Sequence, residues 1–263
     1  MAKYNKLAGK HIVVIGGSNG IGRGVVEASL ESGARVTLSG SSPQSAEAAV
    51  SALKKEYPSP QLVGLNCDLS NATVEADLES LLRQAVAAHD GAPIDHIVLT
   101  AADNLSIVPL QDMTPEVIAK ATHMRMLVPI LVGKLAQRHL RPSANCSLTL
   151  TTGSIADKPM ADWSLINFLC TGIVGLTRNL ALDLQPRRVN IVEPGLVDTG
   201  LWDTTWPTAK EREEGLRELA EKLKLPVGKA GGVEEVAEAY VYLMRDRNAT
   251  GEVVKTRGGS HLV

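Results

Sequence analysis

The chain has 263 residues, with 27 basic and 29 acidic side chains and a formal net charge of −2. Because charges of both signs are interspersed, the composition excludes the strongly basic surface that nucleic acids or anionic membranes attract. A small molecule is therefore the expected substrate or ligand, with no nucleic-acid partner and no membrane partner.

Strands and helices are predicted to alternate along the whole chain. Apolar runs predict strands at residues 11–15, 34–38, 61–66, 94–100, 147–152, 189–192 and 252–255. Helical patterns cover residues 21–30, 43–57, 73–89, 114–139, 164–184, 209–224 and 233–244. Strands joined through helices must run parallel, which predicts an α/β fold: a single Rossmann-type doubly wound parallel sheet with helices on both faces. No linker interrupts residues 1–263, so we expect one domain.

Targeting signals and cysteine usage both favour a cytoplasmic protein. The first ten residues contain no apolar signal region, and the most apolar later stretch, residues 127–136, is too short to cross a bilayer. Three cysteines without CxxC spacing favour reduced thiols and indicate no zinc site, so no metal is expected.

The first strand ends in a glycine-rich turn, GGSNGIG at residues 16–22. Glycine permits tight backbone turns and leaves the free N–H groups of a helix open to an incoming phosphate. The turn therefore suits a pyrophosphate, although glycine turns without a ligand are also frequent. Its Gly-x-x-x-Gly-x-Gly spacing differs from the commoner Gly-x-Gly-x-x-Gly fingerprint.

Four segments together resemble the classical short-chain dehydrogenase/reductase family. They are IGGSNGIG at residues 15–22, CDL at 67–69, EPGLVDT at 193–199 and GEVVKTRGG at 251–259. The resemblance implies a nicotinamide cofactor, with the glycine turn at the pyrophosphate, the second segment at the adenine and the third at the nicotinamide. The cofactor-binding residues that it implies are Gly16, Ser18, Asn19, Gly20, Ile21, Gly22, Ser41, Ser42, Asp68, Leu69, Ala101, Ala102, Pro194, Gly195, Val197 and Thr199.

The end of the second strand favours NADP(H) over NAD(H). An acidic residue there would accept a hydrogen bond from the ribose 2′-hydroxyl and repel a 2′-phosphate, and this chain has the sequence SGSSP at residues 39–43. The hydroxyl groups of Ser41 and Ser42, with backbone N–H groups of the next helix, could hold the phosphate. The alternative is that these residues only cap that helix.

Most catalytic residues of the family are replaced. Family members carry a Tyr-x-x-x-Lys pair in which the tyrosine protonates the substrate oxygen. Those positions hold Ile166 and Cys170, and the asparagine position of the long helix holds Arg125. Ser154, or otherwise Gly153, matches the catalytic serine. Reduction of a ketone needs a proton donor, whereas hydride addition to an iminium yields a neutral amine, so we expect the second kind of chemistry.

Four residues are the candidate catalytic group: Arg125, Asp162, Trp163 and Ser154. Asp162 would supply a counter-charge for a cationic nitrogen, unless it only caps the following helix. Arg125 would anchor a substrate oxygen; the alternatives are that it braces the cofactor ribose or pairs with Asp157 or Asp162.

All three tryptophans fall near the expected mouth of the site, at Trp163, Trp202 and Trp206. Flat indole rings suit a polycyclic substrate, but the last two could instead plug a lid against the body. By resemblance the substrate lid covers about residues 196–227, and the charges at residues 210–214 are expected to form its solvated outer face.

The replaced residues and the Pro-x-x-Asp-Trp loop resemble an atypical fungal branch of the family. That branch includes NADPH-dependent reductase/Diels-Alderase enzymes of indole alkaloid biosynthesis, in which the aspartate lies three residues before the tryptophan, where this chain has Met160. The leading hypothesis is an NADP(H)-dependent oxidoreductase that reduces an iminium or other activated natural-product intermediate. The alternatives are a redox-silent cyclase or isomerase with structural NADP(H), and a cofactor-binding pseudoenzyme. By family analogy we expect a homodimer or homotetramer formed through the helices at residues 114–139 and 164–184.

Overall fold

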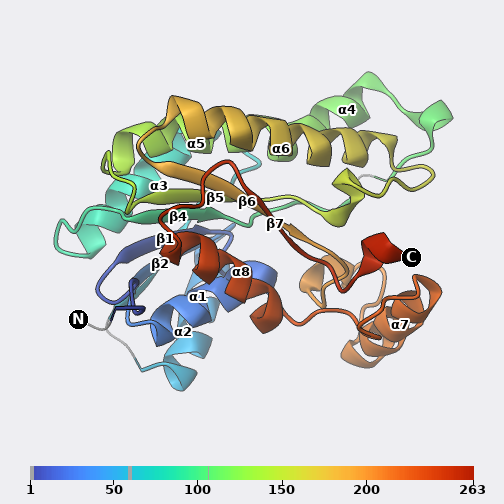
Figure 1. Cartoon of the computed structure of the whole chain (residues 1–263), viewed down its shortest axis with the longest axis horizontal. Coiled ribbons are helices and arrows are strands. Elements are labelled where there is room, and N and C mark those ends of the chain that lie inside the picture. The colour runs from blue at the N-terminus through green and yellow to red at the C-terminus, as the bar shows by residue number, and fades with distance from the viewer. Residues whose placement is uncertain (1–2, 59–60, 106) are drawn as a thin grey trace.

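Figure 1 shows the computed structural model of the protein, which describes residues 3–58, 61–105 and 107–263. Seven parallel strands form one sheet in the order β3-β2-β1-β4-β5-β6-β7. The strands are β1 His11–Ile15, β2 Arg35–Gly40, β3 Leu62–Asn66, β4 His96–Leu99, β5 Ser147–Thr151, β6 Arg188–Pro194 and β7 Val253–Thr256. The predicted doubly wound parallel sheet is thus confirmed, and the order reverses between β1 and β4, where such sheets bind ligands. Residues 1 and 2 of the expected domain lie outside the described residues.

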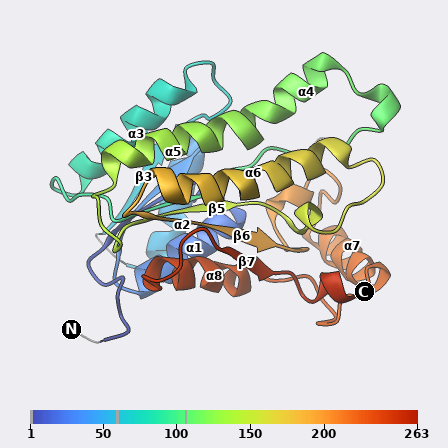
Figure 2. The same cartoon turned by 45° about the horizontal axis from the view of Figure 1, so that its top comes forward.

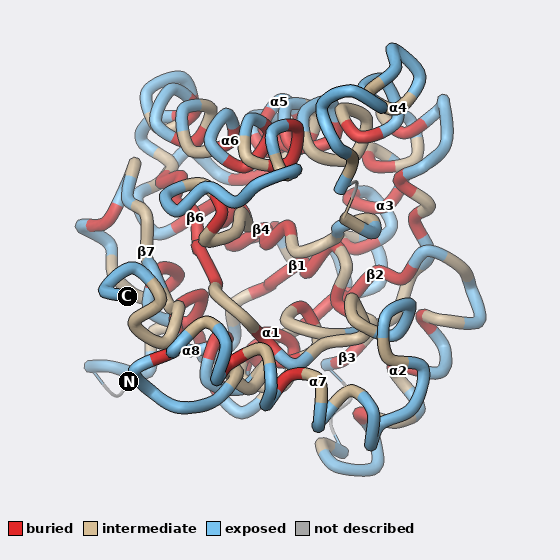
Figure 3. Tube along the Cα trace, turned by 90° about the vertical axis from the view of Figure 1, so that its right-hand side faces the viewer, coloured by how far each residue is buried: buried red, intermediate tan, exposed pale blue. Residues whose placement is uncertain are grey.

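Helices cover both faces of the sheet (Figures 1 and 2). One layer contains α1 Gly20–Glu31, α2 Pro43–Glu56 and α8 Val233–Arg245. The other contains α3 Val74–Ala88, α4 Pro115–Thr122, α5 Val128–His139 and α6 Ser164–Asp183, while α7 Ala209–Lys222 lies apart at the carboxyl ends of the strands. Figure 3 views the molecule from that side. Short 3-10 helices are η1 Leu110–Asp112, η3 Ser154–Ala156, η4 Gly200–Trp202 and η5 Ser260–Leu262.

Strand β1 illustrates why the central strands are apolar along their whole length. Val13 and Ile15 pack with residues of α3, α5 and α6, whereas Ile12 and Val14 pack with residues of α1, α2 and α8. Successive side chains of a strand point to opposite faces, so a sheet covered on both sides needs apolar residues at every position.

The helix predicted at residues 114–139 is confirmed as one helical stretch over residues 115–139, but it is not α-helical throughout. A π-helical segment, η2 His123–Leu127, separates α4 from α5. Pro129 stands in the first turn of α5. Because proline has no N–H and its ring clashes with the carbonyl group four residues earlier, a regular α-helix cannot run through Arg125. The π-helical segment accommodates that proline, and such segments often occur at functional sites.

Helix α6, rather than residues 127–136, is the most membrane-like segment that the structure describes. By length and composition alone α6 could cross a bilayer, and 39% of its most apolar window is buried in the fold. The core helix of a water-soluble protein passes the same test. Here α6 packs against β6 and contributes Ile173 and Leu180 to the core.

Candidate active site

The glycine-rich turn, α1 and the end of β4 approach one another too closely for side chains. Gly16 has φ +88°, and a Cβ atom there would lie 2.5 Å from the backbone nitrogen of Ala101. A Cβ atom on Gly22 would lie 2.1 Å from the carbonyl oxygen of Gly16 and 2.4 Å from Oγ1 of Thr100. The structure therefore places bare backbone at the switch point of the sheet, as a phosphate-binding turn requires.

The segment after β6 lies against the same turn. A Cβ atom on Gly20 would be 3.4 Å from Cβ of Thr199, and one on Gly200 would be 2.8 Å from Nδ2 of Asn19. The Asn19 side chain caps α1, because its Oδ1 accepts a hydrogen bond from the backbone N–H of Gly20 at 2.7 Å. The structure thus brings together residues predicted for the pyrophosphate and for the nicotinamide end of one cofactor.

The remaining residues expected near the nicotinamide occupy neighbouring positions. Pro194 pairs with Thr256 at the end of β6, and the N–H of Gly195 donates to the carbonyl group of Thr256 at 3.0 Å. Val197 is buried and forms an isolated bridge with Gly231. Among the other predicted cofactor residues, Ser18 and Ile21 are half-buried and Ala102 is exposed.

At the end of β2, Ser42 serves as the N-cap of α2. Its Oγ accepts a hydrogen bond from the N–H of Ser45 at 3.2 Å, and Oγ of Ser45 accepts one from the N–H of Ser42 at 3.1 Å. The capping alternative for Ser42 is confirmed, although its hydroxyl hydrogen can still donate to a phosphate. Ser41 is exposed beside it.

The expected adenine segment is held by local hydrogen bonds. Oδ1 of Asp68 accepts from the hydroxyl group of Ser70 at 2.7 Å and from its N–H at 2.9 Å, and these bonds lower the pKa of Asp68. The carbonyl oxygen of Leu69 lies 2.7 Å from Nε2 of His123 in η2. His123, for which the sequence indicates no role, therefore positions this segment.

Buried apolar side chains occupy the two positions that match the family's catalytic tyrosine and lysine. Ile166 has an exposed fraction of 0% and Cys170 of 6%, and both pack with Ile155, Trp163 and Leu105. Burial raises the pKa of the Cys170 thiol, which keeps it protonated and unreactive. These positions therefore supply neither a proton donor nor a nucleophile.

Arg125, on η2, pairs with Asp103 in the loop after β4. Its Nη2 donates to the backbone carbonyl oxygen of Asp103 at 2.8 Å and lies 3.0 Å from Oδ1 of the same residue. The alternatives of a pair with Asp157 or Asp162 are wrong, since the carboxylate paired with Arg125 is that of Asp103, and Asp157 binds Lys255 instead. Asp103 is the main residue of the site that sequence reasoning missed.

The other three catalytic candidates lie in the loop between β5 and α6. Asp162 is exposed and has φ +66°. It does not cap α6, because Trp163 occupies the N-cap position and forms no side-chain cap bond. Trp163 is half-buried against the apolar cluster, and Ser154 is half-buried at the start of η3.

Trp202 and Trp206 pack against each other and against other residues of the lid. The ring centroids of Trp202 and Trp206 are 5.3 Å apart, and Nε1 of Trp202 donates to the carbonyl oxygen of Val197 at 3.0 Å. A Cβ atom on Gly215 of α7 would lie 2.2 Å from the Trp206 ring. All of these contacts lie within the lid at residues 196–227, so they show both rings packed on lid residues, and both interpretations of the two tryptophans stay predictions.

Arg212 of the lid helix α7 forms ion pairs with two carboxylates outside that helix. Nε of Arg212 lies 2.9 Å from Oδ1 of Asp198, and its Nη1 lies 2.6 Å from Oδ1 of Asp203. The expectation of a wholly solvated face at residues 210–214 was therefore wrong for Arg212, whose side chain is only 28% exposed. The ion pairs connect α7 to the segment predicted to hold the nicotinamide.

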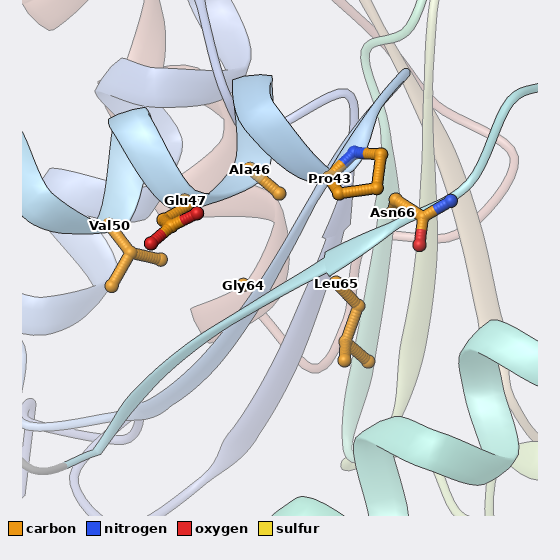
Figure 4. Close-up of a pocket in the computed structure, with 7 residues that line it drawn as sticks. All are labelled: Pro43, Ala46, Glu47, Val50, Gly64, Leu65 and Asn66. Atoms are coloured by element: carbon orange, nitrogen blue, oxygen red, sulfur yellow. The ribbon is translucent and has the colours of Figure 1, made fainter.

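A separate hollow lies between α2 and the edge strand β3 (Figure 4). Its lining consists of Pro43, Ala46, Glu47, Val50, Gly64, Leu65 and Asn66. None of the catalytic candidates lines it. Within the described part of the chain, no group of three His, Cys, Asp or Glu side chains could hold a metal ion, and all three cysteines are buried free thiols.

The fold and the family match define the class of the protein. The family model for SDR-like Rossmann domains matches residues 3–263, so the chain belongs to the short-chain dehydrogenase/reductase family. It is an oxidoreductase of that family, whose fold binds a nicotinamide cofactor.

Two fungal relatives and one solved structure resemble the chain over almost its whole length. The chain is 36% identical to the short-chain dehydrogenase/reductase fsr5 of Gibberella fujikuroi, over 100% of this chain and 98% of that protein. It is 38% identical to malC of Malbranchea aurantiaca, over 96% of this chain and 95% of that protein. The structure of the MalC reductase/Diels-Alderase aligns with a TM-score of 0.89 and 37% identity, covering 99% of each chain. These relatives support placement in an atypical fungal branch.

A bacterial structure shares the fold at lower identity. The NADPH-bound short-chain oxidoreductase from Pseudomonas aeruginosa, described as containing an atypical catalytic center, aligns with a TM-score of 0.86 and 23% identity. The alignment covers 95% of this chain and 96% of that one.

Proposed function

We propose that the protein is an NADP(H)-dependent reductase that delivers hydride to an iminium or similarly activated intermediate, without a proton donor from the protein. The apolar cluster at Ile166 and Cys170 carries this proposal. Hydride addition to a ketone creates an alkoxide, which has no donor at this cluster. Hydride addition to an iminium removes a charge and creates none, so an apolar wall does not oppose it.

The residues around the glycine-rich turn fit a dinucleotide. Backbone at Gly16, Gly20 and Gly22 would hold the pyrophosphate at the N-terminus of α1. Asp68 and Leu69 would contact the adenine. When bound, the nicotinamide supplies the hydride. NADP(H) is favoured because the β2–α2 loop has no carboxylate to repel a 2′-phosphate, while Ser41 presents an exposed hydroxyl group.

We further propose a polycyclic substrate from natural-product biosynthesis, in the manner of an alkaloid intermediate. The MalC structure, named as a reductase/Diels-Alderase, supports this assignment at 37% identity. Trp163 would be a wall of the site, and Arg125 and Ser154 lie close to the same apolar cluster. A cytoplasmic homodimer or homotetramer fits the apolar side chains exposed on α5 and α6, among them Ile130 and Phe168.

Titration with NADPH and NADH, followed by stopped-flow measurement of NADPH oxidation, tests the proposal. The substrates compared are a cyclic iminium and the ketone of matching ring size. We expect tighter binding of NADPH than of NADH, and oxidation with the iminium alone. Equal rates with the ketone would contradict the proposal, and tight NADPH binding without oxidation by either compound would favour a redox-silent cyclase.

A further inference from the structure

The loop after β4 connects the cofactor turn to the apolar cluster. Ala101 lies against Gly16 at the start of this loop, so closely that Gly16 can carry no side chain. Leu105, four residues further on, packs with Ile166 and Cys170. Asp103 is midway between these two contacts. Its place in the loop is therefore between the predicted pyrophosphate turn and the position of the missing tyrosine.

Arg125 fixes Asp103 through both its backbone and its side chain. The two contacts from Nη2, at 2.8 Å and 3.0 Å, hold the loop and the carboxylate together. The side chains of Arg125 and Asp103 are 16% and 27% exposed, so water screens this pair less than a surface pair. Since Arg125 belongs to the π-helical segment that precedes Pro129, the backbone that presents the guanidinium is itself fixed.

The pair has unused hydrogen-bonding capacity. Nε of Arg125 is buried without an acceptor, whereas Oδ1 of Asp103 is buried and engaged by Nη2 in the ion pair. Buried polar groups in folded proteins are nearly always satisfied, so the unpaired N–H indicates that protein groups alone do not saturate this pair. With Oδ1 buried against Nη2, Oδ2 is the carboxylate oxygen available to a ligand.

We propose that Asp103 is the carboxylate that selects a cationic nitrogen, and that Arg125 is the residue that positions it. This inference rests on the proposed function. Asp162, the carboxylate expected from the sequence, is exposed on its loop, where solvent screens its charge. Asp103 is partly buried, is held in place, and lies on the segment that joins the cofactor turn to the apolar wall.

The proposed role of Asp103 also gives a physical reason for release of the amine product. In this proposal an iminium cation would lie against Oδ2 of Asp103. With NADPH bound, hydride addition would form the new C–H bond at the iminium carbon and turn the π electrons into the nitrogen lone pair, so that the products would be a neutral amine and NADP⁺. No proton moves in this step. The attraction to Asp103 disappears as the charge is lost, which favours release of the amine.

Binding to the NADP⁺-loaded protein tests the inference without turnover. The probes are the N-methyl dihydroisoquinolinium cation and its uncharged carbon isostere, methyl dihydronaphthalene, measured by calorimetry. We expect Asp103→Asn to weaken binding of the cation about tenfold or more, because it removes a partly buried charge. Binding of the isostere should change less than about twofold, since it has no charge to lose. Asp103→Glu should restore part of the affinity for the cation.

Two control variants distinguish the contribution of Asp103 to cation binding from the contributions of other carboxylates. Asp112→Asn removes an exposed carboxylate from the same connection between β4 and α4 and should leave both affinities unchanged. Asp162→Asn should also leave cation binding close to that of the wild type. Loss of cation binding in Asp162→Asn but not in Asp103→Asn would overturn the inference in favour of Asp162.

Turnover of the same cation with NADPH distinguishes the two proposals. Hydride transfer by the wild type, with unchanged cation binding in Asp103→Asn, would refute the role of Asp103 and leave the proposed function intact. Absence of hydride transfer, with cation binding that depends on Asp103, would refute the reductase function and support the binding site. In Asp103→Asn the KM for the cation should rise more than kcat falls.

Discussion

A single methyl group at Gly22 should abolish most of the affinity for NADPH. In the Gly22→Ala variant, the new Cβ atom would lie 2.1 Å from the carbonyl oxygen of Gly16 and 2.4 Å from Oγ1 of Thr100. The Thr100 hydroxyl group bonds to the carbonyl oxygens of Ile15 and Gly16, both at 3.2 Å, so the turn and the end of β4 must move together. The strained turn relaxes away from its original position, and returning it there to hold the pyrophosphate would cost about 2 kcal/mol of overpacking, which corresponds to about a thirtyfold higher Kd.

Fluorescence titration with NADPH measures this change, with a circular dichroism spectrum and a Tm to show that the variant is folded. Gly172→Ala is the matched control, because Gly172 is also helical but an added Cβ would meet no heavy atom within 4 Å. The control should bind NADPH normally and be stabilised by up to about 1 kcal/mol, the difference in helix propensity between the two residues. If Gly22→Ala bound NADPH as tightly as the control, the phosphate site would not lie at this turn.

Three further outcomes are expected. Ile166→Tyr combined with Cys170→Lys should raise the rate of ketone reduction, measured by NADPH oxidation, by about a hundredfold, which is the contribution typical of a general acid. If the double variant were as inactive on ketones as the wild type, the alignment of these two positions with the family's pair would be wrong. Arg212→Met should increase protease cleavage of the lid about fivefold, since two exposed ion pairs contribute about 1 kcal/mol in total; an unchanged cleavage rate would show that these pairs do not hold the lid. Burial lowers the folded-state pKa of His11 to about 4 and of His96 to about 3. Each of these histidines then stays neutral in the folded protein, while in the unfolded chain it protonates near its ordinary pKa of 6.5. Stability should therefore be full above pH 6.5 and fall by about 2 kcal/mol per histidine by pH 5. Urea titrations at both pH values test this, and His96→Gln should show the smaller fall.

Local sequence patterns predicted the strands of the sheet because the apolar pattern of each strand depends only on the residues of that strand. A strand buried on both faces needs an unbroken apolar run, and the five residues of β1 show it without reference to any other part of the chain. The π-helical turn in the long helix has an equally local signal, although it was not predicted. Pro129 stands four residues after Arg125, which is the spacing at which proline disrupts a helix.

Contacts between distant segments were not predictable in this way. The pair of Arg125 with Asp103 depends on how the helix before α5 packs against the loop after β4, and neither segment contains a motif that indicates the other. Arg212 presents a similar case, because a charged residue on an amphipathic helix has the same local sequence whether it faces solvent or a carboxylate. Sequence reasoning therefore predicted the glycine turn and the replaced family positions, but not these two ion-paired arginines.

The altered catalytic positions and the ion pair affect different steps of the proposed reaction. An alkoxide forming on a ketone would face Ile166, and the absence of one hydrogen-bond donor to such an oxyanion costs about 3 kcal/mol, or more than a hundredfold in rate. This penalty falls on the transition state of the ketone alone. Asp103 instead acts on the bound cation, before hydride transfer begins. Preference for iminium over ketone should therefore persist in Asp103→Asn when rates are compared at saturating substrate, whereas the Ile166→Tyr and Cys170→Lys double variant should reduce that preference.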